Sequence, residues 1–413
     1  MNEEYGEKSK RSWYGLAKMN TNKKNVFLEA LSERLLENKD FILQENERDI
    51  ANGVEKGLSS ALIDRLKLDD KRIEGMSKGV RDIIALPDPV GKIEGMKRLP
   101  NGLLVGKMRT PIGSILIIYE ARPNVTVDAF VLCFKSGNAT ILKGGSEAIN
   151  SNRALIRIIK DTLTECDMDP DMVQFVDSTD RTILNDLLKM DNYIDLVIPR
   201  GGEGLIRFVA QNATMPVIKH YKGVCHVYVD EDSDLENALE IAINAKVQRP
   251  GVCNAMETLL VDAKIAEKFL NMLKEGMDKN SVSLRGCKRT LAILPGIEEA
   301  TEDDWYTEYL DLILSVKVVD GVDDAIDHIN KYGSHHSDAI VTNDYAKAMK
   351  FIQEVDSAAV YANASTRFTD GGEFGLGAEI GISTDKIHAR GPMGLEELTS
   401  VKWIVFGNGQ IRE

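Results

Sequence analysis

One cysteine lies in sequence surroundings that suit a nucleophile. Cys253 belongs to the segment QRPGVCNAMETLLV (248–261), in a Gly- and Pro-bearing loop that we expect between a helix and a strand. A thiol in such a loop, near Arg249, can ionise to the thiolate, which is the reactive form of the side chain. The alternative is a thiol that only fills space, as most cysteines do. That alternative suits the remaining cysteines better: Cys133, Cys166, Cys225 and Cys287.

A glycine pair in ILKGGSEA (141–148) follows one predicted strand and precedes a predicted helix. Gly144 and Gly145 permit a tight turn, and a helix N-terminus offers free N–H groups and a positive dipole end to an anion. Lys143 adds a positive charge at the same place. The pattern favours a nucleotide site, with an ordinary turn capped by Ser146 as the alternative.

PRGGEGLI (199–206) repeats this arrangement at a later strand, with Gly201 and Gly202 after Arg200. Two helix N-termini opened by glycine in one sheet can share a dinucleotide, one near the ribose and one near the pyrophosphate. A simple tight turn remains the alternative here as well.

Composition excludes several classes of protein. The 413 residues include 51 Lys and Arg against 65 Asp and Glu, a net charge of −14, so neither nucleic acid nor an acidic membrane is an expected partner. No apolar run approaches the roughly 20 residues of a membrane span, and the N-terminal segment lacks the apolar core of a secretion signal. The five cysteines form no C-x-x-C or Cys–His cluster. We therefore expect a reduced cytoplasmic protein without a metal.

The elements that must position these residues alternate along the chain. Helical periodicity over 24–52 and 70–86 opens the protein. Apolar strands are then predicted at 115–119, 139–143, 172–176 and 193–199, with amphipathic helices between them. This alternation indicates an α/β fold with a doubly wound, mostly parallel sheet, whose ligands bind beyond the carboxyl ends of the strands.

A second alternating unit follows, so we expect two α/β domains. Residues 1–229 would form the cofactor-binding domain, to which 361–395 return, and residues 230–360 would form the catalytic domain that carries Cys253. Residues 100–112 and 396–413 are expected to form a small β element for oligomerisation.

Several longer segments together resemble one family. RTPIGSILIIYEARPNVTVDA (109–129), QRPGVCNAMETLLV (248–261) and EIGISTDKIHARGPMGLEELT (379–399) are similar to the gamma-glutamyl phosphate reductases, within the aldehyde dehydrogenase superfamily. The resemblance covers nearly the whole chain. It implies an aldehyde dehydrogenase-like fold, a homo-oligomer (dimer or tetramer) and NADPH as cofactor.

The resemblance also implies individual roles. The nucleophile of the family falls on Cys253, and the superfamily's oxyanion-binding asparagine falls on Asn124. With the backbone N–H of Cys253, Asn124 would hold the oxygen where negative charge develops. The residues implied in cofactor binding are Lys143, Ser146, Glu147, Gly201, Gly202 and, by a looser match, Glu308.

One position departs from hydrolytic aldehyde dehydrogenases, which carry a general-base glutamate before a strand. The matching stretch here, 219–223, is Lys-His-Tyr-Lys-Gly and holds no carboxylate. An enzyme that passes an acyl group to phosphate does not need to activate water, so this absence suits acyl-phosphate chemistry. His220 is a less favoured base, because nothing obvious in the sequence orients it.

The implied reaction is the reduction of L-glutamyl 5-phosphate to L-glutamate 5-semialdehyde and phosphate by NADPH, through a thioester on Cys253, in proline biosynthesis. A glutamate 5-kinase that makes the unstable substrate is a candidate partner. Candidates for binding the phosphate or the carboxylate are Arg122, Arg249, Lys219 and Lys222. Two alternatives stay open: an aldehyde dehydrogenase for another acyl phosphate or aldehyde, and a catalytically silent binding protein.

Overall fold

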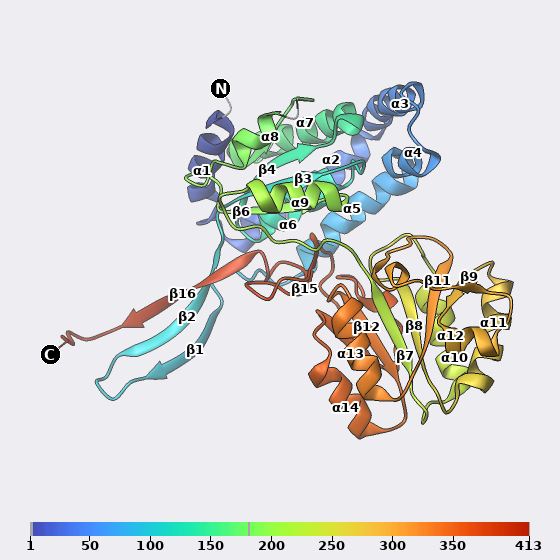
Figure 1. The fold of residues 1–413 in the computed structure, drawn as a ribbon. Helices are drawn as coiled ribbons and strands as arrows, with labels where there is room; N and C mark the ends of the chain where they lie inside the picture. The colour runs from blue at the N-terminus through green and yellow to red at the C-terminus, as the bar shows by residue number, and fades with distance from the viewer. Residues whose placement is uncertain (1–2, 181, 413) are drawn as a thin grey trace. The chain divides into compact units, whose positions relative to one another are not determined.

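The computed structural model of the protein describes residues 3–180 and 182–412, which divide into two compact units (Figure 1). Residues 1, 2, 181 and 413, which belong to the ranges expected for the cofactor domain and the β element, lie outside the described residues. Unit 1 comprises the chain up to Lys219, the segment Gly375–Gly381 and the residues from Met393 onward. Unit 2 comprises His220–Phe374 and Ile382–Pro392.

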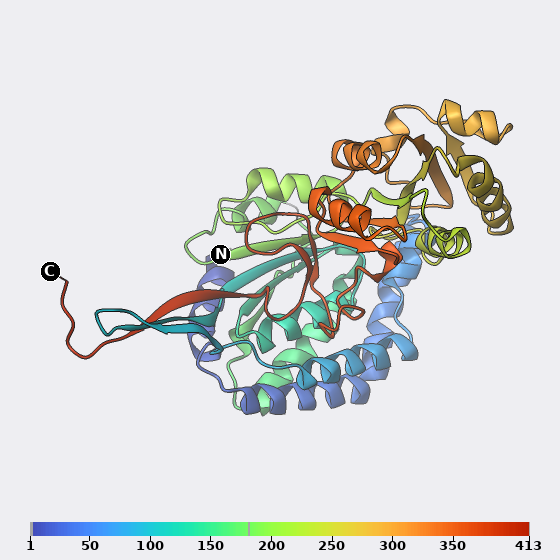
Figure 2. The same ribbon diagram turned by 90° about the horizontal axis from the view of Figure 1, so that it is seen from below.

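Unit 1 is built on a parallel sheet with the strand order β5-β4-β3-β6, and helices lie on both of its faces (Figures 1 and 2). The central strand SILIIY is buried along its whole length, as expected for a strand covered on both faces. The strands are β3 (Ser114–Tyr119), β4 (Ala139–Gly144), β5 (Val173–Phe175) and β6 (Leu196–Arg200).

The helices of unit 1 open the chain, as expected, but the segment 24–52 is divided at Asn38 into two helices, and the helices at 3–16 and 60–66 were not expected. The helices of this unit are α1 (Glu3–Leu16), α2 (Thr21–Glu37), α3 (Lys39–Glu55), α4 (Ser60–Leu66), α5 (Asp70–Ala85), α6 (Val125–Lys135), α7 (Ile149–Glu165), α8 (Thr182–Leu187) and α9 (Glu203–Asn212), with the short 3₁₀ turns η1 (Ser146–Ala148) and η2 (Pro170–Met172).

A three-stranded antiparallel sheet extends from unit 1 as a ribbon (Figures 1 and 2). The segments 100–112 and 396–413, expected to form a β element, contain β2 (Leu104–Pro111) and β16 (Thr399–Phe406), which pair over their full length. Strand β1 (Ile93–Arg98) pairs with the other edge of β2 and was not expected from the sequence.

Unit 2 is built on a second parallel sheet, with the order β10-β9-β11-β8-β7-β12-β13. One hydrophobic cluster includes residues of α10 and α11, and a separate cluster includes residues of α13 and α14. The sheet is therefore also covered on both faces, by the helix pairs that flank it in Figure 1.

The strands of unit 2 are β7 (Cys225–Val229), β8 (Met256–Asp262), β9 (Ser283–Gly286), β10 (Glu298–Glu299), β11 (Ile313–Val319), β12 (Ser337–Val341) and β13 (Ala359–Ala362). The helices are α10 (Leu235–Val247), α11 (Ala266–Lys279), α12 (Lys288–Ile293), α13 (Val322–Tyr332) and α14 (Tyr345–Glu354), with the 3₁₀ turns η3 (Asp303–Tyr306) and η4 (Thr366–Phe368). A small sheet pairs β14 (Gly381–Ser383) with β15 (Gly391–Met393).

The structure divides the chain differently from the expected boundary at 229/230. Strand β7, which we expected in the cofactor domain, pairs with β8 and β12 and so belongs to unit 2. The returning segment is also shorter than 361–395. Strand β13 pairs with β12, and only Gly375–Gly381 and the residues from Met393 onward join unit 1.

In the described part of the chain, the helices lack the length or the apolarity needed to cross a membrane.

Candidate active site

The predicted cofactor residues of unit 1 lie at one edge of its sheet. In the register of the parallel strands, Tyr119 at the end of β3 is paired with Gly144 at the end of β4 and with Arg200 at the end of β6. The loops after these strands therefore emerge together, at the edge where doubly wound sheets bind ligands. This arrangement brings both glycine turns beside the loop that leads to Asn124.

The turn before α9 already holds an anionic side chain. The backbone N–H of Gly202 donates to Glu120 Oε2 over 2.9 Å. A Cβ at Gly201 would lie 2.4 Å from the same oxygen, so a larger residue there would require the Glu120 side chain to shift. The N-terminus of α9 thus holds a carboxylate of the chain itself, and its role in cofactor binding stays a prediction. Glu120 was missed, although it lies within the YEARPN segment.

The turn after β4 places Lys143 and Glu147 on either side of the glycine pair. Lys143 Nζ donates to the Gly144 carbonyl oxygen over 2.9 Å, and burial lowers its pKa while Glu147 opposes that shift. Glu147 Oε1 accepts the backbone N–H of Ala121, and a Cβ at Gly145 would lie 2.1 Å from this oxygen. Ser146 is exposed and opens η1 instead of capping a helix, so the N-cap alternative was wrong.

Asn124 is held by a carboxylate on the next turn of its helix. It stands at the N-cap of α6, and its Nδ2 donates to Asp128 Oδ2 over 2.8 Å. Burial raises the pKa of Asp128 to about 6, and the hydrogen bond from Asn124 and the charge of Arg200 oppose that rise. One N–H of the amide is occupied in this way, which fixes the direction of the other. Arg122, a candidate for substrate binding, is exposed in the same loop.

Cys253 lies in the turn between α10 and β8, and it is half-buried. Its backbone is confined from both sides. The thiol of Cys225 donates to the Cys253 carbonyl oxygen over 3.1 Å, and Gly223 packs so closely that a Cβ there would lie 1.7 Å from this carbonyl oxygen. A confined backbone and a residue that is not fully buried suit a nucleophile.

Asn254, the next residue, joins this turn to η4. Its Nδ2 donates to the carbonyl oxygens of Arg367 (3.3 Å) and Thr369 (2.8 Å), and Thr366 Oγ1 donates to its carbonyl oxygen over 2.7 Å. The Arg367 guanidinium in turn donates to Asn254 Oδ1. Arg367 thus lies beside the nucleophile turn, although sequence reasoning did not single it out.

The remaining predicted residues lie in unit 2 or at its boundary, and two of them have partners that restrict their roles. Glu308 Oε1 accepts the Gly223 N–H over 2.8 Å, so this carboxylate lies next to the nucleophile turn. Lys222 Nζ donates to the Tyr306 carbonyl oxygen over 2.6 Å. Arg249 is exposed. Lys219 is the last residue of unit 1 and is half-buried.

His220 is oriented, contrary to what the sequence suggested. Its Nδ1 lies 2.9 Å from the Ile382 carbonyl oxygen. Because a carbonyl oxygen only accepts, Nδ1 carries the proton and Nε2 is the basic atom of the neutral ring.

The other cysteines differ among themselves. Burial raises the pKa of Cys133 to about 12 and that of Cys225 well above its ordinary value, which agrees with inert thiols. Cys287 departs from this expectation. Partial burial would raise its pKa, but hydrogen bonds from Thr290 and from backbone groups outweigh that effect and lower the pKa.

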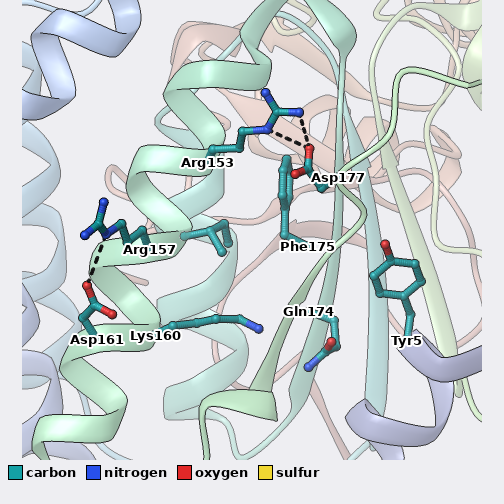
Figure 3. Close-up of a pocket in the computed structure, with 9 residues that line it drawn as sticks. Tyr5, Arg153, Arg157, Lys160, Asp161, Gln174, Phe175 and Asp177 are labelled. Atoms are coloured by element: carbon teal, nitrogen blue, oxygen red, sulfur yellow. Dashed lines mark hydrogen bonds and ion pairs between the residues drawn. The ribbon is translucent and has the colours of Figure 1, made fainter.

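A surface hollow of about 440 Å³ lies on unit 1 between α7 and β5, away from these residues (Figure 3). Its arginines are matched by carboxylates, since Arg153 pairs with Asp177 and Arg157 with Asp161. None of the predicted site residues lines it. Among the described residues, no group of three or more acidic, His or Cys side chains is placed to hold a metal ion.

Comparison with known proteins decides the family. A model of the aldehyde dehydrogenase family matches residues 89–311 and 305–404. Gamma-glutamyl phosphate reductase of Thermodesulfovibrio yellowstonii is 58% identical over 408 residues, which cover 98% of this chain and 97% of the relative. The chain belongs to the gamma-glutamyl phosphate reductase family. The enzyme of that name from Caldicellulosiruptor bescii is 57% identical over 414 residues, covering 99% of both chains.

The crystal structure of gamma-glutamyl phosphate reductase from Thermotoga maritima is 49% identical and covers 100% of both chains, with a TM-score of 0.98. The predicted family and the aldehyde dehydrogenase-like α/β fold are therefore confirmed. As a member of the gamma-glutamyl phosphate reductase family, the protein is an oxidoreductase of the aldehyde dehydrogenase type.

Proposed function

We propose that the protein reduces L-glutamyl 5-phosphate to L-glutamate 5-semialdehyde and phosphate with NADPH, in proline biosynthesis from glutamate, through a thioester on Cys253. The observation that carries this proposal is the 58% identity, over nearly the full length, to a protein named gamma-glutamyl phosphate reductase. The half-buried Cys253 in its confined turn supports it, because the chemistry needs one fixed sulfur nucleophile.

The chain's own residues divide the chemical work. Cys253 attacks the C5 carbonyl carbon and later releases the aldehyde. Asn124 donates its second amide N–H to the oxygen that gains negative charge, and Asp128 keeps the amide oriented for this. The 219–223 stretch offers no carboxylate to activate water, so the thioester survives until it is reduced.

A nicotinamide dinucleotide fits the residues at the sheet edge of unit 1. The Glu120 carboxylate on the Gly202 N–H supports an anion-binding role for the N-terminus of α9, where Gly201 and Gly202 would take the pyrophosphate. Lys143, Ser146 and Glu147 would lie at the adenosine ribose, and Glu308 is a further candidate contact. When bound, the cofactor supplies the hydride.

NADPH is favoured over NADH by Lys143, whose ammonium can pair with a 2′-phosphate. Glu147 would favour a free 2′-hydroxyl if its carboxylate faced the ribose. Glu147 Oε1 accepts a hydrogen bond from the Ala121 N–H. This contact supports the view that the carboxylate is engaged with the backbone and not with the ribose.

The β1-β2-β16 sheet is the proposed oligomerisation element. Its last strand exposes apolar side chains, with Trp403 exposed by 65% and Phe406 by 56%. Exposed aromatic side chains on one strand are typical of surfaces that another chain covers. A dimer or tetramer, a cytoplasmic location and contact with the glutamate 5-kinase stay predictions.

The direct test is oxidation of glutamate 5-semialdehyde by the purified protein with NADP. We expect NADPH to form over repeated turnovers only when inorganic phosphate is present, and to stop at one equivalent per enzyme without it. Failure to form NADPH even with phosphate would contradict the proposed function.

A further inference from the structure

Two arginines of unit 2, one in the nucleophile loop and one beside it, form no ion pair with another described residue. Arg249 precedes Cys253 in the same loop, and Arg367 lies in η4. Within the described residues neither guanidinium forms an ion pair, whereas Arg285 and Arg390 of the same unit do. Burial lowers the pKa of Arg367, the charge of Arg249 lowers it further, and Cys253 and the exposed Asp370 oppose the shift. Arg367 therefore lies within electrostatic reach of Arg249 and of Cys253, and Asp370 acts on it without forming an ion pair.

Arg367 is fixed by neutral groups. Its Nη1 donates to Asn254 Oδ1, and its Nε donates to Gln248 Oε1 over 2.9 Å. Asn254 is itself bound to the backbone of η4. These amide acceptors hold the guanidinium beside the turn of Cys253 without neutralising it. A half-buried guanidinium that is held by neutral acceptors and forms no ion pair is prepared to bind an anion.

The reaction offers two anions, and their positions relative to the sulfur differ. In a glutamyl 5-phosphate, the phosphate is bonded to the carbonyl group that Cys253 attacks. The α-carboxylate lies at the far end of the carbon chain. The anion that comes next to the sulfur is therefore the phosphate.

We propose that Arg367, together with Arg249, binds the phosphate group of the acyl phosphate that reacts with Cys253. This assignment rests on the proposed function and adds Arg367 to the substrate-binding residues. As the sulfur lone pair forms the C–S bond, the C5–O bond to phosphate breaks and its electron pair leaves with the phosphate. The guanidiniums stabilise that departing anion, and in the reverse direction they position phosphate to attack the thioester.

Alkylation of Cys253 tests the anion site without any substrate. Iodoacetate and iodoacetamide differ in charge, and mass spectrometry of the Cys253 peptide gives the rate for each. We expect Arg367→Gln to lower the iodoacetate-to-iodoacetamide rate ratio on the order of tenfold, a typical scale for a charge-assisted contact. The iodoacetamide rate should stay the same. Inorganic phosphate should slow the alkylation of Cys253 by iodoacetate in the unmodified protein. It should have no such effect in Arg367→Gln.

Arg390→Gln is the matched control, because Arg390 belongs to the same unit and pairs with Asp356. We expect its rate ratio to equal that of the unmodified protein. An unchanged ratio in Arg367→Gln would overturn the proposal. An equal loss of both alkylation rates would also overturn it, because Arg367 would then act only by supporting the turn through Asn254.

Steady-state kinetics of the oxidative direction assign the anion. In Arg367→Lys, which keeps the charge but loses the fork of donors, we expect the KM for phosphate to rise at least severalfold and the KM for the semialdehyde to stay within about twofold. A rise in the semialdehyde KM alone would assign Arg367 to the carboxylate and overturn the proposal. If the unmodified protein shows no phosphate-dependent oxidation, the proposed function fails, while the alkylation ratio still decides whether the anion site exists.

Discussion

Gly223 and Cys253 approach each other so closely that residue 223 has no room for a side chain. A Cβ at Gly223 would lie 1.7 Å from the Cys253 carbonyl oxygen and 2.5 Å from its Cα. The Gly223 N–H also donates to Glu308 Oε1 over 2.8 Å. One glycine thus sets the position of the nucleophile's backbone and of a neighbouring carboxylate.

Gly223→Ala should therefore displace the nucleophile turn. We expect kcat to fall at least a hundredfold and the free energy of unfolding to drop by about 1–3 kcal/mol, the usual cost of overpacking. Gly251→Ala is the matched control, since a Cβ there would meet only the Leu310 carbonyl oxygen at 3.7 Å. Kinetics and chemical unfolding of both variants provide the check, and wild-type activity in Gly223→Ala would refute the close contact.

Asp128 should matter for activity through Asn124. Asp128→Ala removes the acceptor of the Asn124 amide, so we expect kcat to fall about tenfold with little change in the KM for NADPH. Asp128→Asn retains an oxygen acceptor and should keep most of the activity. Equal losses in the two variants would show that the carboxylate has some role besides orienting the amide.

The raised pKa of Asp128 also predicts a pH dependence of stability. The folded protein holds this proton up to about pH 6, whereas an unfolded chain releases it near the ordinary value of 3.8. The folded state therefore binds more protons between these values, and stability falls as pH rises through this window. We compare the unfolding free energy of the unmodified protein with that of Asp128→Asn. The difference between them should decline from pH 4 to pH 6, the window that the two pKa values bound. A difference that does not vary with pH would contradict the raised pKa.

Lys143 should set the preference for NADPH. Lys143→Ala removes the ammonium expected at the 2′-phosphate, so the ratio of kcat/KM for NADPH to that for NADH should fall about tenfold. Lys160→Ala, on α7 at the separate surface hollow, serves as the control and should leave the ratio unchanged. Equal kcat/KM values for the two cofactors in the unmodified protein would argue against this role.

Lys219→Glu should introduce a base where hydrolytic relatives of the superfamily carry one. We expect this variant to oxidise the semialdehyde slowly without phosphate, because a carboxylate can accept a proton from water. His220→Gln is a useful companion, since His220 is held by the Ile382 carbonyl oxygen and its Nε2 is basic. If phosphate-independent oxidation is already present and disappears in His220→Gln, the histidine activates water.

Local patterns in the sequence were enough to predict the sheet edges and both glycine turns, which follow from strand–turn–helix signals. Cys253 follows from its loop and from the family resemblance, and Asn124 from that resemblance alone. Asp128 could also have been found, because it lies one helical turn after Asn124. Long-range pairing could not be read in this way. Arg367 contacts Asn254, which lies 113 positions earlier in the chain. Strand β7 belongs to unit 2 because it pairs with β12, and this pairing places His226 beside Asp338, 112 positions later.

The acyl state of Cys253 tests the central claim most directly. The protein is incubated with glutamate 5-semialdehyde and NADP in phosphate-free buffer, NADPH is followed by absorbance, and the Cys253 peptide is analysed by mass spectrometry. We predict NADPH equal to the enzyme concentration, a glutamyl thioester on Cys253, release of that group on adding phosphate or arsenate, and neither product in Cys253→Ala. Continuous NADPH formation without phosphate, or a Cys253 that never carries the acyl group, would contradict the phosphate-dependent thioester mechanism.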